Sequence, residues 1–369
     1  MSKRRKKKLN RRQQEIRRKR LKKRKRRRAI VIIIELIILC ILGTTAFALF
    51  KLGKMERTSL TNIKNNGLKQ TGYTNIALFG LDSRGKNLGK GNRTDTIMIA
   101  SINNETKKVK LISVYRDTML KQNGEHYDKA NAAYSVGGPE TAVNMLNENL
   151  DLDIQDYVSV NFLALADVID MVDGITVKMT DEEVVHMNNY CVETSKVTGK
   201  KYKKIEPAVA GTYKLNGVQA VSYARIRYTA GGDYKRTERQ RLVLEKTANK
   251  LKKQNLATIN KIIDKVMPEV STSFSTKEIL ALASGAFDFE LGETSGFPFD
   301  LETPDSVPGY SGSYVIPKGL EENVIKLHEF LFPDEDYTPT ETVTNISDTL
   351  INMTNVYPST TGSGTSQDE

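Results

Sequence analysis

The residues best suited to do chemistry lie in the segment YARIRYTAGGDYKRTERQR, positions 223–241, which contains five arginines. A guanidinium is a planar fork of N–H donors that matches the oxygens of a phosphate better than a point charge does. If residues 220–227 form a strand, Arg225 and Arg227 point to the same face, because side chains in a strand repeat every two residues. That face could bind phosphate, or it could be a solvent-exposed face paired with acids.

The second half of this segment predicts a helix from about residue 236 to residue 253. In a helix, Arg236 and Gln240 are four residues apart and share a face, with Arg239 beside them. Gly231 and Gly232 form a turn that would bring this face against the predicted strand. The arrangement suits several phosphate oxygens better than a single carboxylate.

Carboxylates occur where the first three predicted strands begin or end. Asp82 follows the first strand, Asp95 begins the second, and Arg116 and Asp117 follow the third. Open α/β sheets place ligands at strand ends, and carboxylates there could hold a hard cation such as Mg²⁺ against a diphosphate. Asp82 and Asp95 are therefore the metal candidates, although either acid alone is more often a turn residue. Asp117 is a positioning acid.

Charge and motif content exclude several functional classes. The net charge of +12 comes from residues 1–28, which hold 19 of the 56 Lys and Arg but only one of the 44 acids. The remaining chain is mildly acidic, so it lacks a general attraction for nucleic acid. The sequence contains two cysteines, three scattered histidines and none of the HExxH, GxxxxGK[ST] or GxSxG motifs. This pattern disfavours metalloprotease, nucleotide-triphosphate and acyl-transfer chemistry.

Strands and helices alternate along the chain, which predicts a layered α/β domain. The predicted strands are 75–79, 96–101, 109–114, 157–160, 175–179 and 220–227. The predicted helices are 141–150, 162–171, 236–253, 256–266, 276–287 and 320–332. Residues 333–369 are rich in Thr, Ser, Asp and Gly, and we expect this tail to be disordered.

The N-terminal region predicts a membrane anchor. Residues 29–50 are apolar except for Glu35, and at 1.5 Å per residue they span roughly 33 Å, enough for a bilayer core. The basic stub 1–28 should stay in the cytoplasm, which places residues 51–369 outside the cell. Residues 51–71 resemble a polar stalk. Glu35 could be neutral in the bilayer or pair within a helix assembly, and its role stays open.

Seven ordered motifs then resemble those of the LytR-CpsA-Psr family. They are NIALFGLDSR, RTDTIMIASIN, KLISVYRDT, KANAAYSVGG, VDGITV, LNGVQAVSYARIRY and GGDYKRTERQR, and they cover about residues 74–253. The resemblance implies an α/β/α sandwich with a catalytic core at 72–255 and a C-terminal helical part at 256–332. One departure is Tyr115, where many family members have proline before the Arg-Asp pair.

The resemblance also implies a function. Such proteins, mainly of Gram-positive bacteria, are phosphotransferases that move a glycopolymer from undecaprenyl diphosphate to peptidoglycan, at the C6 hydroxyl of N-acetylmuramic acid. The implied cofactor is Mg²⁺, or Mn²⁺, held by Asp82 and Asp95. The implied catalytic residues are Arg116, Asp117, Arg225, Arg227 and Asp233, and the implied substrate-binding residues are Arg84, Arg116, Arg225, Arg227, Arg236, Arg239 and Gln240.

Three questions stay open at the level of sequence. Either Asp82 or Asp117 could accept the proton of the attacking hydroxyl. The same pocket could instead use water and act as a lipid-diphosphate hydrolase, or the chain could be a membrane-bound regulatory protein. The polymer that is carried, whether teichoic acid, capsule or another wall polymer, and the oligomeric state are not determined by these residues.

Overall fold

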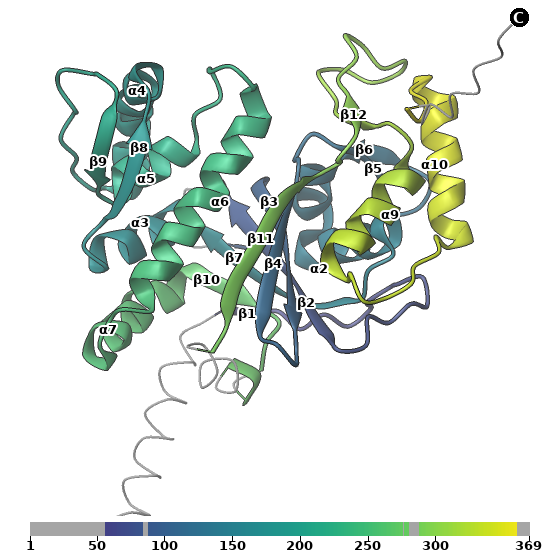
Figure 1. Cartoon of the computed structure of the whole chain (residues 1–369), viewed down its shortest axis with the longest axis horizontal. Coiled ribbons are helices and arrows are strands. Elements are labelled where there is room, and N and C mark those ends of the chain that lie inside the picture. The colour runs from purple at the N-terminus through teal and green to yellow at the C-terminus, as the bar shows by residue number, and fades with distance from the viewer. Residues whose placement is uncertain (1–55, 84–87, 276, 280–287, 360–369) are drawn as a thin grey trace, which may run out of the picture. The chain divides into compact units, whose positions relative to one another are not determined.

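A seven-stranded mixed sheet runs through the domain (Figure 1). The structure is a computed structural model that describes residues 56–83, 88–275, 277–279 and 288–359. The strands are β1 (Glu56–Arg57), β2 (Tyr73–Leu81), β3 (Thr94–Asn103), β4 (Lys108–Val114), β7 (Ile154–Asn161), β10 (Val270–Thr272) and β11 (Glu290–Phe297). Their order across the sheet is β1-β10-β7-β2-β3-β4-β11. β2 pairs antiparallel with β3 and parallel with β7, so the predicted strands at 75–79, 96–101 and 157–160 meet at the centre.

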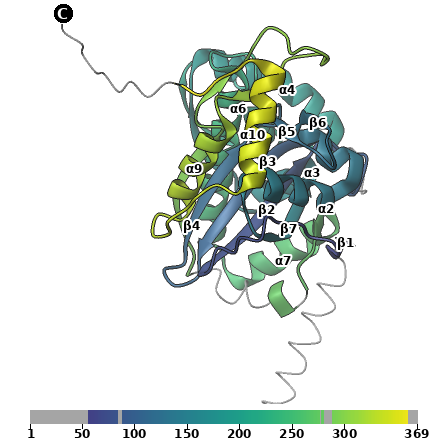
Figure 2. The ribbon, with the colours of Figure 1, turned by 90° about the vertical axis from the view of Figure 1, so that its right-hand side faces the viewer.

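Helices cover both faces of this sheet, as the predicted α/β/α layering requires. One face is covered by α2 (Ala130–Leu150), α9 (Leu320–Leu331) and α10 (Glu341–Thr354). The other face is covered by α3 (Phe162–Met171), α5 (Gly217–Ala224), α6 (Gly232–Leu251) and α7 (Leu256–Val266). Figures 1 and 2 show these two helical layers from perpendicular directions.

Smaller elements lie at the margins of the sandwich. The hairpin of β8 (Ile175–Met179) and β9 (Gly211–Leu215) lies with α4 (Asp181–Thr198) beyond α5. Thr180 caps α4 in a capping box with Glu183, which satisfies backbone N–H groups of the first turn. Three-residue strands β5 (Met119–Lys121) and β6 (Tyr127–Lys129) pair beside α2, and β12 (Leu301–Glu302) pairs with β13 (Ile316–Pro317).

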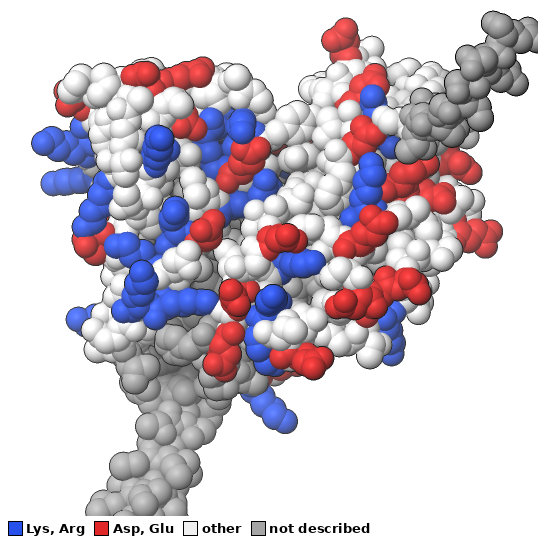
Figure 3. Space-filling model, viewed as in Figure 1, with Lys and Arg blue, Asp and Glu red and all other residues white. Residues whose placement is uncertain are grey.

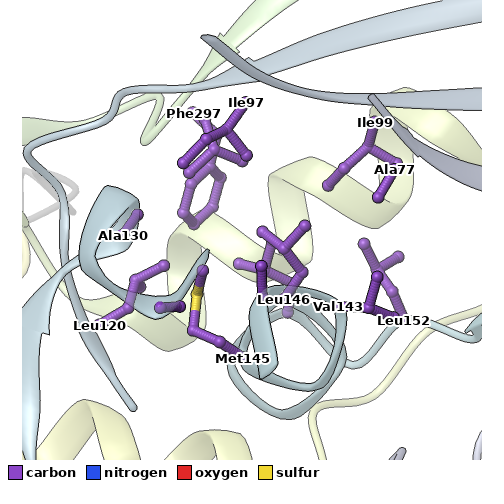
Figure 4. Packing of buried hydrophobic residues seen from close by; sticks show 14 of the residues in the cluster. Ala77, Ile97, Ile99, Leu120, Ala130, Val143, Met145, Leu146, Leu152 and Phe297 are labelled. Atoms are coloured by element: carbon purple, nitrogen blue, oxygen red, sulfur yellow. The ribbon is translucent and has the colours of Figure 1, made fainter. Parts of the chain in front are cut away.

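The main core fills the space between the sheet and α2, α9 and α10. Figure 4 shows Ile97 and Ile99 of β3 and Phe297 of β11 beside Val143 and Leu146 of α2. All five side chains are at most 2% exposed. Burial of apolar area on this scale drives folding, and it fixes the sheet against one helical layer.

The predicted strand at 220–227 is wrong, because residues Gly217–Ala224 form α5. Asn216 caps this helix, and its side chain accepts a hydrogen bond from the Gln219 N–H. All eight residues of α5 are buried. In a helix of only eight residues that are all buried, periodicity alone does not distinguish the helix from a buried strand.

Two segments expected to be loosely attached are packed against the domain. In the tail predicted to be disordered, Thr340 caps α10, and Val343, Ile346 and Leu350 of that helix join the main core. The buried carboxylate of Asp151 holds this segment through the Tyr337 hydroxyl, at 2.6 Å, and the Thr340 N–H, at 2.9 Å. A short polar segment can be ordered when a few apolar side chains and one buried acceptor hold it.

The predicted stalk is likewise attached to α2 over residues 60–66. Leu60 and Ile63 pack against the main core. The Thr61 N–H donates to Glu140, and the Lys64 N–H donates to Asn144. The sequence lacked periodicity there because the segment is held mainly by hydrogen bonds to a neighbouring helix.

Several predictions fall on residues outside the described ranges. They are the basic stub 1–28, the membrane span 29–50, Arg84 and most of the predicted helix at 276–287. Within the described ranges, no helix combines the length and the apolar character that a bilayer crossing needs. The other predicted helices are present, and those at 162–171 and 256–266 have the bounds of α3 and α7.

Candidate functional site

Asp95, near the start of β3, is the centre of the candidate site. Its carboxylate accepts from Arg116 Nη1 at 2.7 Å and from Arg227 Nη2 at 3.4 Å. Its backbone carbonyl accepts from Arg236 Nη2 at 3.2 Å and from Gln240 Nε2 at 3.5 Å. Strand β3, the end of β4, the loop after α5 and the first turns of α6 therefore meet at one residue.

Asp233 is a second carboxylate that holds the same guanidiniums. It lies in the first turn of α6, after Gly231, whose φ of +86° favours glycine. Asp233 pairs with Arg236 at 3.0 Å and lies 3.8 Å from Arg116 and 3.9 Å from Arg227. Burial raises the pKa of Asp233, and the neighbouring arginines oppose that shift. Asp95 and Asp233 thus hold the three guanidiniums in fixed positions relative to one another.

The pocket around these residues carries an excess of positive charge. Its volume is about 260 Å³, and it is lined by Asp82, Arg93, Asp95, Arg116, Phe162, Tyr190, Arg225, Arg227, Arg236 and Gln240. We call this the arginine pocket. Five arginines face two aspartates, a composition that attracts a multiply charged anion.

Arg236 shows that the arginines are incompletely paired. Its side chain is 1% exposed, and burial, together with Arg227 and Arg116, lowers its pKa to about 10 against the opposing effect of Asp233. Within the described part of the chain, Nε and Nη1 of Arg236 have no hydrogen-bond partner. Buried N–H groups of a cation are rarely left unsatisfied, so these donors indicate a ligand with anionic oxygens.

The pKa of Arg116 shifts in the opposite direction to that of Arg236. Burial lowers its pKa, but Asp117, Asp95 and Asp233 outweigh burial, and the net shift is upward. Its Nε lies 3.4 Å from Asp117, which also binds Lys129 at 3.0 Å. Asp117 therefore flanks the pocket and orients Arg116 from outside the lining.

Arg225 lies between the arginine pocket and a second, apolar cavity. It caps the C-terminus of α5, pairs with Glu193 at 3.0 Å and donates to Thr194. Its guanidinium also lies 5.0 Å from the Phe162 ring and 5.6 Å from the Tyr190 ring. These contacts hold Arg225 rigidly at the boundary.

The apolar cavity lies between the sheet and helices α3, α5 and α6 and has a volume of about 250 Å³. Leu78, Met98 and Val160 line it from β2, β3 and β7, and Leu165 and Val243 line it from α3 and α6. The residues shared with the arginine pocket are Phe162, Arg225 and Gln240. A cationic pocket joined to an apolar cavity fits an amphiphile with an anionic head and a hydrocarbon tail.

The structure brings most of the predicted site residues together. Asp82, Asp95, Arg116, Arg225, Arg227, Arg236 and Gln240 line the arginine pocket, and Asp117 and Asp233 flank it. Arg93, Phe162 and Tyr190 were missed. Arg93 could have been found, because it precedes Asp95 by two residues, and side chains two apart share a strand face.

Arg239 does not line the arginine pocket. It pairs with Glu183 of α4 at 2.8 Å and donates to the Ile226 carbonyl and to the Thr229 hydroxyl. The prediction that it binds substrate rested on its place beside the face shared by Arg236 and Gln240. Instead, Arg239 fixes the loop between α5 and α6, which carries Arg227.

Asp82 and Asp95 are the carboxylates that could hold a metal in this pocket. The described residues contain no group of three or more His, Cys, Asp and Glu side chains able to bind an ion. Mg²⁺ is commonly bound by one or two carboxylates together with substrate phosphates and waters. The two acids fit that donor set, in which a bound diphosphate supplies further oxygens.

Surface charge differs between the two sides of the domain. Figure 3 shows Lys and Arg over the side of α6 and α7, and Asp and Glu over the side of α9 and α10. Helix α6, on the side where more Lys and Arg are seen, contributes Arg236 and Gln240 to the lining of the arginine pocket.

Known proteins resemble this chain across the same region. Biofilm regulatory protein A of Streptococcus mutans is 30% identical over 254 residues, which cover 65% of this chain and 60% of that protein. Polyisoprenyl-teichoic acid--peptidoglycan teichoic acid transferase TagU of Enterococcus faecalis is 28% identical, covering 67% of this chain and 78% of its own length.

A solved structure shares the fold. It is LytR-CPS2A-psr family protein YwtF (TagT) with bound octaprenyl pyrophosphate lipid, with a TM-score of 0.53 and 21% identity, covering 74% of this chain and 99% of that one. The model of the LytR_cpsA_psr family matches residues 44–293. That match spans well over half of the sequence, and the chain therefore belongs to the LytR_cpsA_psr family.

Proposed function

We propose that this protein transfers a glycopolymer from a prenyl diphosphate carrier to peptidoglycan. The observation that carries the proposal is the junction of the two cavities at Phe162, Arg225 and Gln240. The arginine pocket suits a diphosphate, and the apolar cavity suits the first isoprene units of a lipid tail. The transferase name of one relative and the octaprenyl pyrophosphate named with one solved structure support the same substrate class.

The proposed reaction is an in-line displacement at phosphorus. The oxygen of an acceptor hydroxyl, in our proposal the C6 hydroxyl of N-acetylmuramic acid, attacks the phosphorus that carries the polymer. The bond from this phosphorus to the bridging oxygen breaks, and the prenyl phosphate leaves with the electron pair. Positioning and charge neutralisation supply most of the catalysis in phosphoryl transfer.

Each side chain has a part in this scheme. Arg116, Arg227 and Arg236 bind the diphosphate oxygens and stabilise the charge that develops on the leaving group. Asp233 is the candidate acceptor of the hydroxyl proton, because its carboxylate lies 3.8 Å from Arg116 and 3.9 Å from Arg227 beside the pocket and burial raises its pKa. Asp82 and Asp95 would hold Mg²⁺, which when bound supplies a Lewis acid at the phosphate oxygens.

The proposed location is the outer face of the cell membrane, with the chain anchored through residues 29–50. The apolar run and the basic residues before it support this orientation. A prenyl carrier and peptidoglycan are both accessible on that side, so the location and the reaction are consistent.

The test uses the full chain in detergent micelles with a prenyl-diphosphate-linked glycopolymer and peptidoglycan oligomers. Arg227→Ala should lower the transfer rate by about 10²–10³-fold, because one charge-stabilising donor is lost. The matched control is Lys214→Ala. It removes an exposed cation of β9 that pairs with Asp173. Mass spectrometry identifies the product: polymer joined to glycan supports transfer, whereas free polymer phosphate indicates hydrolysis. Unchanged transfer in Arg227→Ala would refute the arginine pocket as the site.

A further inference from the structure

A third cavity lies on the other side of the loop that carries Arg227. It has a volume of about 520 Å³ and is lined mainly by polar and charged residues, with Thr180, Glu182 and Glu183 contributed by the start of α4. Thr229 and Ala230 of the α5–α6 loop form a second wall. The loop between α5 and α6 therefore lines both cavities, this one through Thr229 and Ala230 and the arginine pocket through Arg227.

One face of α4 connects the two cavities. Glu182, His186 and Tyr190 are spaced by four residues, so they lie along the same side of the helix. Tyr190 lines the arginine pocket and Glu182 lines the third cavity. His186 lies between them, with Nε2 at 3.8 Å from the Glu182 carboxylate.

Tyr228 faces this stripe from the opposite side. It follows Arg227, its ring lies 6.3 Å from the His186 ring at an angle of 36°, and it is 74% exposed. We name Glu182, His186, Tyr190, Tyr228 and the third cavity the α4 groove. A large aromatic ring left exposed next to a reactive site offers an apolar face to a ligand.

The charges in the α4 groove select against an anionic occupant. Arg239 is paired with Glu183 at 2.8 Å, and Lys235 is paired with Glu238 at 2.7 Å. Both described cations that line the third cavity are therefore neutralised by acids, while Glu182 adds a further carboxylate. A polymer rich in phosphate gains no attraction there, whereas the sugar rings of a glycan without phosphate can stack on the aromatic rings and bind the polar side chains.

We propose that the α4 groove binds the acceptor, an N-acetylated glycan strand that carries no phosphate, and delivers its hydroxyl to the arginine pocket. The inference rests on the proposed transferase function and adds the acceptor site to it. An aromatic wall formed by Tyr228 and His186 places a sugar ring beside Arg227, and the third cavity accommodates the next sugars of the strand. The lipid donor occupies the arginine pocket and the apolar cavity and does not use this groove.

The test measures steady-state kinetics of the full chain with peptidoglycan glycan oligomers as acceptor. Tyr228→Ala should raise KM for the acceptor about tenfold, equivalent to one lost ring contact, with kcat and the donor KM unchanged. Tyr228→Phe keeps the ring and should restore the acceptor KM. The matched control, Tyr357→Ala, removes a tyrosine that is 64% exposed and follows α10 on the other face of the sheet.

A charge-reversal variant separates the two possible occupants. Glu182→Lys should leave the donor KM unchanged if the groove holds the acceptor glycan, which carries no phosphate. A lower donor KM in this variant, or a higher donor KM in Tyr228→Ala, would show that the groove holds the anionic polymer and would overturn the inference. An unchanged acceptor KM in Tyr228→Ala would overturn it as well.

Direct binding distinguishes this inference from the proposed function. Calorimetry of the glycan oligomer with the full chain, without lipid, should give about tenfold weaker binding for Tyr228→Ala than for the wild type. If the wild type binds glycan in this way but transfers no polymer, the proposed transferase function is refuted, while the assignment of the α4 groove as a glycan site is supported. If the wild type transfers polymer while Tyr228→Ala and Glu182→Lys bind glycan and react normally, the assignment of the α4 groove is refuted and the proposed transferase function is supported.

Discussion

The two faces of the central sheet use the same strands in opposite ways. Ile97 and Ile99 of β3 point into the core beneath α2, whereas Thr96 and Met98 of the same strand line the apolar cavity. One face is filled with interdigitated side chains, and the other retains about 250 Å³ of space. Because side chains alternate along a strand, one stretch of sequence can build a stable core and a binding cavity at once.

Local contacts help to keep the second face open. A side chain at Gly80, on β2, would lie 2.9 Å from Thr96 Cβ, so no larger residue fits at this edge of the cavity. The helices on that side carry Arg225 and Gln240 at the cavity mouth instead of further apolar residues. We expect the filled face to supply most of the stability and the open face to supply the binding.

The largest expected effect is on the free energy of unfolding, and it follows from the difference between the filled face and the open face of the sheet. Ile99→Ala should lower the free energy of unfolding by about 3 kcal/mol, because it leaves a void in a filled core. Met98→Ala, one residue away on the cavity face, should cost roughly half as much, since its surroundings already include empty space. Urea denaturation of both variants measures the difference. Equal losses would show that both faces contribute alike to stability.

A smaller effect is expected when the open face is filled. Val160→Phe places an aromatic ring in the apolar cavity and should weaken binding of a prenyl diphosphate about tenfold. Binding of inorganic pyrophosphate, which needs only the arginine pocket, should not change. Calorimetry with both ligands tests this, and an equal loss for the two would mean that the variant disturbs the arginine pocket and not the tail site.

The smallest effect concerns pH on the filled face. Burial lowers the pKa of His328, and its hydrogen bond to the Leu150 carbonyl opposes that shift only in part. The folded state therefore favours the neutral ring, and this stabilisation is fully present above the ordinary pKa of 6.5 and is lost as the pH falls through the lower folded value. His328→Gln should flatten the dependence of the melting temperature on pH between about 7 and 5. An equally steep curve in this variant would assign the dependence to other groups.

Much of the fold was predictable because it depends on local patterns. Short β-branched runs predicted the central strands, and the bounds of α3 and β8 were found as they stand in the structure. The predicted strand at 220–227 was wrong because α5 has only eight residues, all of them buried, and periodicity alone does not distinguish so short a buried helix from a strand. The tail was misjudged because Asp151, nearly 190 residues earlier, holds Thr340.

The candidate site was predictable in composition but not in every orientation. Arg236 and Arg239 are three residues apart on α6, and the helix alone does not distinguish them. Packing directs Arg236 toward Asp95 and Asp233, whereas Glu183 of α4 draws Arg239 to the other side. Arg225 was expected on a strand face beside Arg227, yet it reaches the pocket from the C-terminus of a helix.

The sequence by itself determined which charges and apolar residues exist and, through local periodicity, most of the helices and strands. It also carried the family motifs, since the spacing of Asp82, Asp95, Arg116 and the 223–241 segment needs no knowledge of contacts. Only the tertiary structure decided that the arginine pocket shares residues with an apolar cavity. It also decided that the face of α4 with Glu182, His186 and Tyr190 runs from this pocket to the third cavity. The physical reason is that a cavity is shaped by side chains from distant segments, and its size depends on how closely whole layers pack.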